Sequence, residues 1–393
     1  MFSPRHLLIF ALASLTLTAR AQAVPAPVLS DAEVQVVLGQ GPWPPPVRRD
    51  PGNHVSGQAQ AIELGRRLFR DPRMSPVGYI ACVTCHQPDR AFTDHKARAH
   101  GLADLPRNTP TLVNLSQQRW YGWGGTSDSL WMASIRPMLD AREFDSSPAM
   151  VARLFERDPE LAACYRKVFG VSPRDKPRRT VVNVGKALAA WQETLVTGRT
   201  PFDEFRDALE RRNPAYAASP YPPAALRGLK LFVGAARCVA CHSGPNFSDG
   251  EFHAVPGPER AAPPSALAAS PSDGDTGRLE GARSLKASSM NLLGPYNDDP
   301  GRGNALATRR LVVKESMRGL YRTPGLRNVA VTAPYLHDGR VDGLRDAVLH
   351  PTLPAGPALL AREVDDLVAF LGSLTDRYGE QRPWDPAGLT GCP

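Results

Sequence analysis

Two Cys-x-x-Cys-His units are the residues of this chain best suited to chemistry. They are Cys82-Val83-Thr84-Cys85-His86 and Cys238-Val239-Ala240-Cys241-His242. Two thiols at this spacing can bond the two vinyl groups of one porphyrin, and the adjacent histidine can then coordinate the iron. A redox dithiol or half of a zinc site would also use cysteine pairs, but neither requires the following histidine. We therefore predict two covalently bound c-type haems, with His86 and His242 as axial ligands.

A similar helix leads into each unit. Leu64-Gly65-Arg66-Arg67-Leu68-Phe69 precedes the first unit, and Arg227-Gly228-Leu229-Lys230-Leu231-Phe232 precedes the second. Apolar residues fall on one face of both segments, as in amphipathic helices. This internal repeat predicts two haem domains of related fold. Strand patterns are few, and the 39 prolines and 33 glycines favour loops. We therefore predict a mainly α fold, with two cytochrome c-like domains and long irregular loops.

The chain of 393 residues is long enough for two domains. The predicted organisation is a signal peptide over 1–23, an extended proline-rich arm over 24–53, an N-terminal haem domain over 54–217 and a C-terminal one over 218–382. Prolines at 173, 177 and 201 should divide a helical region between 150 and 209. Further expectations are a helix at 344–349, a flexible Ala/Pro/Ser-rich insertion at 256–272 and a last helix at 361–374.

The N-terminus has the pattern of an export signal. Arg5 precedes an apolar run from Leu7 to Leu17, and Ala21-Gln22-Ala23 offers small residues for cleavage. The run is too short to span a bilayer, although an uncleaved anchor is the alternative. No later segment has the length of a membrane helix, so the expected location is the periplasm. The net charge of +8 is spread along the chain, and no motif indicates a nucleic-acid partner.

Two cysteines remain outside the haem units. In an oxidising compartment Cys164 and Cys392 could pair. A free, buried Cys164 is the alternative, and the sequence does not choose between the two.

The chain resembles the bacterial dihaem cytochrome c peroxidases and MauG-type dihaem enzymes from about residue 64 to 374. The most specific matching segments are Pro106-Arg107-Asn108-Thr109-Pro110-Thr111-Leu112, Thr323-Pro324-Gly325-Leu326-Arg327-Asn328-Val329 and Thr332-Ala333-Pro334-Tyr335-Leu336-His337-Asp338-Gly339. The resemblance implies that hydrogen peroxide reacts at the N-terminal haem while the C-terminal haem relays electrons. The expected partner is a small cytochrome c or cupredoxin that donates electrons, or a protein substrate.

The same resemblance implies roles for individual residues. Trp123 matches the tryptophan between the two haems, and Glu143 matches the distal carboxylate of the peroxidatic haem, which can move a proton between the peroxide oxygens. Pro137 fits the distal wall. Ala133 departs from the family, which often has glutamine there. His100 has the spacing of a histidine that caps the peroxidatic iron in resting peroxidases. The alternatives are that His100 is an exposed loop histidine or that the nearby His95 has this role.

The sixth ligand of the second haem is where the chain departs most from the family. The position that holds methionine or tyrosine in relatives falls on Pro351, which cannot ligate, and His350 stands directly before it. We predict ligation of the iron by His242 and His350. Alternatively His350 only caps the preceding helix, and Met317 is a rival ligand.

The resemblance also implies one calcium ion between the haem domains, held at Asn108, Thr332 and Pro334, whose oxygens suit this cation. Three functions are compatible with these residues. The first is a peroxidase supplied by a small electron donor. The second is a MauG-like enzyme that oxidises tryptophan or tyrosine of a partner protein; Trp120-Tyr121-Gly122-Trp123-Gly124-Gly125 and the missing methionine favour this side. The third is a dihaem electron carrier without its own substrate.

Overall fold

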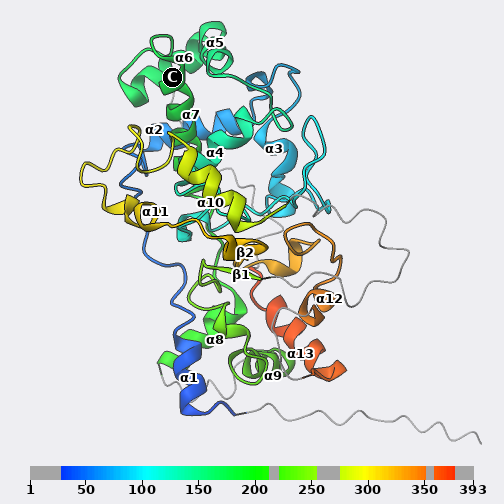
Figure 1. Ribbon diagram of the computed structural model, residues 1–393. Helices are drawn as coiled ribbons and strands as arrows, with labels where there is room; N and C mark the ends of the chain where they lie inside the picture. The colour runs from blue at the N-terminus through cyan, green and yellow to red at the C-terminus, as the bar shows by residue number, and fades with distance from the viewer. Residues whose placement is uncertain (1–27, 212–220, 255–274, 351–357, 377–393) are drawn as a thin grey trace, which may run out of the picture.

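The computed structural model describes residues 28–211, 221–254, 275–350 and 358–376. These residues form thirteen α-helices and one small antiparallel sheet, which confirms the predicted mainly α class. The sheet pairs β1 (Phe252–Ala254) with β2 (Leu320–Arg322), and His253 faces Tyr321 in the register. It lies between an N-terminal and a C-terminal group of helices (Figure 1).

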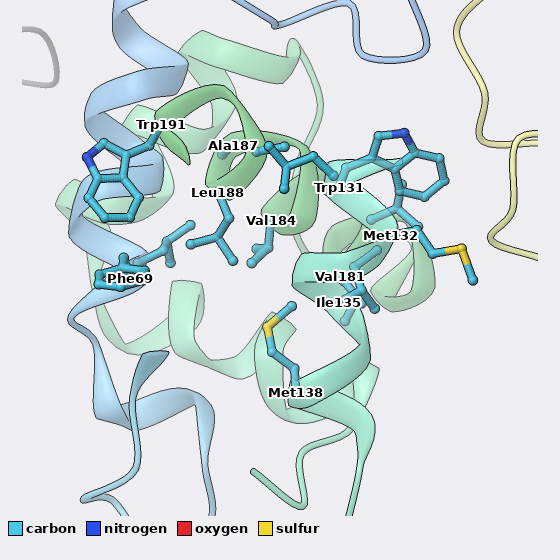
Figure 2. Packing of buried hydrophobic residues seen from close by; sticks show 14 of the residues in the cluster. Phe69, Trp131, Met132, Ile135, Met138, Val181, Val184, Ala187, Leu188 and Trp191 are labelled. Atoms are coloured by element: carbon cyan, nitrogen blue, oxygen red, sulfur yellow. The ribbon is translucent and has the colours of Figure 1, made fainter. Parts of the chain in front are cut away.

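The N-terminal group is built around one long buried helix, α7 (Pro177–Gln192), which packs against α2 and α4. Its other members are α2 (Ala59–Phe69), α3 (Cys82–Cys85), α4 (Leu130–Leu139), α5 (Pro148–Arg157) and α6 (Pro159–Phe169). Figure 2 shows Phe69 of α2 beside Trp191 of α7, and their ring centroids are 4.3 Å apart. Prolines begin α5, α6 and α7, because the first turn of a helix needs no N–H donor there.

The C-terminal group repeats this packing with α9 against α13. Its helices are α8 (Pro201–Glu210), α9 (Pro223–Val233), α12 (Leu344–Leu349) and α13 (Ala361–Gly372). The late helices α10 (Arg278–Ala287) and α11 (Leu306–Arg310) lie with the N-terminal group instead (Figure 1). A Cβ on Gly65 of α2 would lie 2.0 Å from the carbonyl oxygen of Ala187, and one on Gly228 of α9 would lie 1.9 Å from that of Asp366. Each glycine therefore permits a close crossing of two helices in front of a haem unit.

Each of the two hydrophobic cores contains residues from both halves of the sequence. One core combines α2 to α7 with Leu285, Met290 and Leu292, which come from late in the chain. The other combines α9 and α13 with α8 and with Val37. Residues on both sides of the expected boundary at 217 thus contribute to both cores, and the predicted domain limits stay a prediction.

The arm before residue 54 is not wholly extended, in contrast to the expectation from its prolines. It contains α1 (Asp31–Leu38), which a capping box between Ser30 and Glu33 begins. The helix also docks through Val37, which is fully buried. A local cap and tertiary burial therefore outweigh the proline-rich composition of the arm here.

Some of the other expectations fall outside the described residues, and the structure answers the rest. The predicted signal peptide, the insertion at 256–272 and Cys392 lie outside them. Cys164 is fully buried and disulfide-bonded, which excludes the free thiol. The last helix ends at Gly372, two residues earlier than expected. In the part of the chain that the structure describes, no helix combines the length and apolar character that crossing a membrane requires.

Candidate functional site

The first haem unit is held by α3 and the turn that follows it. Cys82 and Cys85 begin and end this short helix, and His86 is its C-cap. The His86 Nδ1–H donates to the carbonyl oxygen of Phe92 at 3.0 Å, which leaves Nε2 to coordinate a metal. Burial lowers the pKa of His86, although the carbonyls of Phe92 and Pro110 oppose this. The imidazole is therefore neutral, as a ligand must be.

The second haem unit has the same geometry. The His242 Nδ1–H donates to the carbonyl oxygen of Phe247 at 3.0 Å. Burial lowers the pKa of His242, opposed by the carbonyls of Phe247 and Pro324. Pro110 and Pro324 each follow a threonine, so a Thr-Pro segment lies against the proximal histidine in both halves.

A cavity of about 650 Å³ opens at the second unit. Cys238, Cys241 and His242 line it, together with apolar residues that include Phe232, Leu326, Leu367 and Leu371. Burial raises the pKa of Cys238 to about 11, so its sulfur lies in apolar surroundings. Apolar walls with two sulfurs and a neutral imidazole at one end fit a thioether-linked haem.

Several sequence-predicted site residues meet in this same cavity. They come from both halves of the chain, and they are Asn108, Trp123, Thr332, Pro334 and His350. Met317, the rival ligand, is not among the residues that line it. The structure therefore brings the expected bridge, the expected calcium residues and the expected sixth ligand next to one haem unit.

Trp123 is half-buried in the turn between Tyr121 and Ser127. Its indole Nε1–H donates to the carbonyl oxygen of Asn108 at 3.0 Å, and its own carbonyl accepts from the backbone N–H of Arg322 at 2.9 Å. The indole is thus anchored to the N-terminal half while its backbone is anchored to the C-terminal half. These two hydrogen bonds restrict the position of the ring, and its role as a bridge stays a prediction.

Glu143 lies near the first haem unit. It follows α4, and its carboxylate is close enough to Cys82 and Cys85 to contribute to the raised pKa of both thiols. Burial raises the pKa of Glu143 itself, whereas Arg136, whose Nη2 is 3.8 Å from the Glu143 Oε1, lowers it. A carboxyl whose pKa is raised in this way is suited to give and take a proton.

The other distal residues lie on α4. Ala133 and Pro137 are both half-buried and stand one helical turn apart, so they share a face of that helix. The chain turns back after them, since the Phe144 N–H donates to the Pro137 carbonyl. This turn places Glu143 beside the end of the helix that carries Pro137.

His100 is exposed, and its Nδ1 lies 2.7 Å from the Asp104 carboxylate. Its backbone nevertheless lies at the haem unit, because the Cys85 Sγ is 3.8 Å from the His100 carbonyl oxygen. Next to it, a Cβ on Gly101 would lie 2.6 Å from the Arg142 carbonyl oxygen. Capping of the iron by His100 would require the imidazole to leave Asp104, and it stays a prediction.

His350 is the C-cap residue of α12. Its Nδ1 is buried without a hydrogen-bond partner among the described residues, and burial lowers its pKa. The imidazole therefore does not cap the helix with its side chain in the described part of the structure. Pro351, the position of the ligand in relatives, lies outside the described residues.

The two halves also pair with each other, which the sequence did not reveal. The Asn108 N–H donates to the His337 carbonyl at 2.8 Å, just as the Arg322 N–H donates to the Trp123 carbonyl. The sequence did contain an indication of this pairing, because Asn108-Thr109-Pro110 and Arg322-Thr323-Pro324 stand at equivalent positions of the internal repeat. Sequence reasoning also missed His337, which is buried, stacks on Tyr321 with ring centroids 3.5 Å apart, and lines the cavity.

Comparison with known proteins agrees with this geometry. Residues 59–211 match the family model described as di-haem cytochrome c peroxidase. The chain is 32% identical to the methylamine utilization protein MauG of Methylorubrum extorquens, over 80% of this chain and 78% of that protein. It is 29% identical to the cytochrome c551 peroxidase of Pseudomonas aeruginosa, over 86% of this chain and 84% of that protein.

Solved structures show the same fold. The diheme peroxidase BthA from Burkholderia thailandensis superposes with a TM-score of 0.64, at 24% identity, over 88% of this chain and 91% of that chain. A MauG-like protein associated with microbial copper homeostasis superposes with a TM-score of 0.61, at 24% identity, over 88% of this chain and 98% of that chain. With its two haem units and these relatives, the chain belongs to the family of di-haem cytochrome c peroxidases and MauG-type enzymes, peroxide-dependent oxidoreductases that carry two c-type haems.

Proposed function

We propose that this chain reduces hydrogen peroxide at its N-terminal haem, with electrons entering through the C-terminal haem. The overall reaction takes up two electrons and two protons and converts one peroxide into two waters. The haems, when bound, supply the iron that binds peroxide and the electrons that reduce it. The observation that carries the proposal is Glu143, a half-buried carboxyl near Cys82 and Cys85.

Glu143 transfers the proton in this proposal. Its ionised carboxylate takes the proton from the peroxide oxygen nearer the iron and delivers it to the leaving oxygen, which departs as water. Arg136 lowers the pKa of Glu143 against the effect of burial and so favours the ionised carboxylate. Ala133 offers no hydrogen bond to peroxide, so Glu143 carries more of the positioning here than in relatives with glutamine at that place.

Rapid mixing of the haem-loaded protein with hydrogen peroxide tests this role. Glu143→Gln should lower the rate of the peroxide-induced absorbance change by about 10²- to 10⁴-fold, the usual contribution of a general acid–base group. Glu193→Gln is the matched control, because burial also raises the pKa of Glu193, to about 7, yet it bonds Ser56 outside both haem units. Equal rates for wild type and Glu143→Gln would refute the assignment.

We further propose that His350 is the sixth ligand of the iron in the C-terminal haem. The support is that His350 and His242 line one cavity and that the buried His350 Nδ1 has no partner among the described residues. His350→Ala should convert the oxidised C-terminal haem from a low-spin to a high-spin absorption spectrum.

His253→Ala is the matched control, since His253 lines the same cavity but bonds Asp249. An unchanged low-spin spectrum in His350→Ala would exclude His350 and leave a ligand from another part of the chain.

A calcium ion between the two halves is also proposed. Asn108, Thr332 and Pro334 line the same cavity, and the Asn108 Nδ2 donates to the Lys96 carbonyl, which leaves the Oδ1 free. The backbone carbonyls of Thr332 and Pro334 accept no backbone hydrogen bond from a described residue. Three oxygens from both halves suit a hard cation.

A MauG-like reaction is the second candidate. The MauG relative is 32% identical, slightly more than the 29% of the cytochrome c551 peroxidase. Steady consumption of peroxide with reduced cytochrome c would support the peroxidase. Negligible turnover with a long-lived oxidised state would support oxidation of a partner protein, and two six-coordinate haems that ignore peroxide would support an electron carrier instead.

We place this chemistry in the periplasm, on the strength of the apolar run from Leu7 to Leu17 and the following Ala21-Gln22-Ala23. The expected result of osmotic fractionation is a mature chain, shortened by about the signal length, in the periplasmic fraction. An uncleaved chain in the membrane fraction would contradict this location.

A further inference from the structure

Arg322 is a buried cation that lacks an anionic partner among the described residues. Arg322 is the last residue of β2 and is only 5% exposed. The guanidinium bonds carbonyl oxygens only, namely those of Thr323 at 3.1 Å and Gly122 at 3.4 Å. Burial accordingly lowers the pKa of Arg322 to about 10, which still leaves it charged at neutral pH.

A buried guanidinium that lines a cavity and bonds only carbonyl oxygens is able to bind an anion there. A buried charge costs free energy unless an opposite charge or several good hydrogen bonds compensate it. The other buried arginine of the cavity follows this rule, since Arg327 forms two hydrogen bonds of 2.9 Å with the carboxylate of Asp203. Among the described residues Arg322 therefore has no anion of its own, and its place in the cavity points to an anion that the site binds.

The position of Arg322 identifies the chemistry of that anion. Arg322 lines the cavity that Cys238, Cys241 and His242 also line, and its backbone N–H holds the carbonyl of Trp123 at 2.9 Å. The only acidic groups of a haem are its two propionates, and a guanidinium binds a carboxylate through two parallel hydrogen bonds.

We propose that Arg322 pairs with a propionate of the haem attached to Cys238 and Cys241, and so fixes that haem's edge against the Trp123 segment. The inference rests on the proposed dihaem function and adds to it an electrostatic difference between the two haems. The equivalent position of the N-terminal half holds the neutral Asn108, as the repeat Asn108-Thr109-Pro110 and Arg322-Thr323-Pro324 shows.

The consequence concerns the reduction potential. A fixed positive charge beside a haem favours its reduced, less positive state, and pairing also neutralises the propionate that would oppose reduction. Arg322 thus raises the potential of the C-terminal haem. This counteracts the lower potential that histidine ligation gives compared with methionine, and it does so at this haem and not at the other.

Spectroelectrochemical titration of the haem-loaded protein, without peroxide, tests the pairing. Arg322→Gln should shift the potential of the C-terminal haem to lower values and leave that of the N-terminal haem unchanged. Arg278→Gln is the matched control, because Arg278 is equally buried and bonds the carbonyls of Gly124 and Gly125, but does not line the cavity. An unchanged C-terminal potential in Arg322→Gln would overturn the proposal.

Arg322→Lys decides the question if Arg322→Gln binds no haem. Lysine keeps the charge but cannot form the two parallel hydrogen bonds. The potential should therefore stay near that of the wild type, while the propionate bending band in the resonance Raman spectrum shifts. An unchanged band would overturn the pairing. A red protein that ignores peroxide would refute the proposed function, yet these measurements on Arg322 would still be possible.

Discussion

In the proposed reaction, Glu143 must change its protonation state, and burial and Arg136 shift its pKa in opposite directions. Burial raises the pKa of Glu143, and the guanidinium of Arg136 lowers it by a smaller amount. The carboxylate must be ionised to accept the first proton, so activity should be lost as the pH falls through this pKa. The pH at which activity is lost therefore reports the pKa of Glu143 that burial and Arg136 produce together.

We predict that the acid limb of kcat/KM for peroxide lies above 4.5, the ordinary value for glutamate. Arg136→Gln should move this limb to higher pH, because it removes the charge that opposes the effect of burial. Glu143→Gln should abolish the limb. A limb at an ordinary glutamate value, unmoved by Arg136→Gln, would show that another group controls the reaction.

At the residue scale, the sequence located the haem ligands and little else by itself. The Cys-x-x-Cys-His pattern is local, so Cys82 and His86 could be predicted from spacing alone. Glu143 was predicted only through a family resemblance, because nothing in the neighbouring sequence separates it from a surface glutamate. Arg322 could not be recognised, since its burial and missing partner arise from contacts between distant segments.

At the scale of elements, the close helix crossings hold each haem unit in place. Gly228 of α9 has no room for a side chain, because the Asp366 carbonyl oxygen of α13 would lie 1.9 Å from its Cβ. Gly65 of α2 makes the equivalent approach to α7. Backbone atoms cannot move aside as a flexible side chain would, so both crossings depend on glycine.

We predict that Gly228→Ala destabilises the protein by about 1–3 kcal/mol or more, the usual range for overpacking a core. Gly372→Ala is the control, because a Cβ there meets no atom within 4 Å and alanine favours helix. Thermal unfolding of both variants provides the comparison. A Gly228→Ala variant as stable as wild type would show that α9 and α13 separate without cost.

The helices were largely predictable because their apolar faces repeat with the helical period. The expected helix at 344–349 is confirmed as α12, and prolines begin α7 and α8 at Pro177 and Pro201. The helix α1 was missed, since its cap is a local signal hidden among prolines. The exchange of segments between the two cores depends on long-range packing, which no local pattern reports.

At the scale of the whole molecule, the two halves form one functional unit through shared segments. Trp123 and Asn108 of the N-terminal half and Arg322 and His337 of the C-terminal half are joined by reciprocal backbone hydrogen bonds. The cavity beside them contains residues of both halves. This junction therefore connects the two halves directly beside the second haem unit.

We predict that calcium stabilises the junction. Removal of the ion with a chelator should lower Tm, and calcium at 100 times its Kd should restore roughly 2.7 kcal/mol. Asn108→Ala should weaken this effect, whereas magnesium should substitute poorly because it demands a tighter octahedral site. The same Tm with chelator and with excess calcium would refute a structural calcium ion.

The most direct test of the division of labour between the haems is electron paramagnetic resonance of the oxidised, haem-loaded protein before and after one equivalent of hydrogen peroxide. With His100 bonded to Asp104 and off the iron, the prediction is one high-spin signal from the haem at Cys82 and Cys85, which peroxide removes, and one low-spin signal from the haem at Cys238 and Cys241. Two low-spin signals that peroxide leaves unchanged would contradict it.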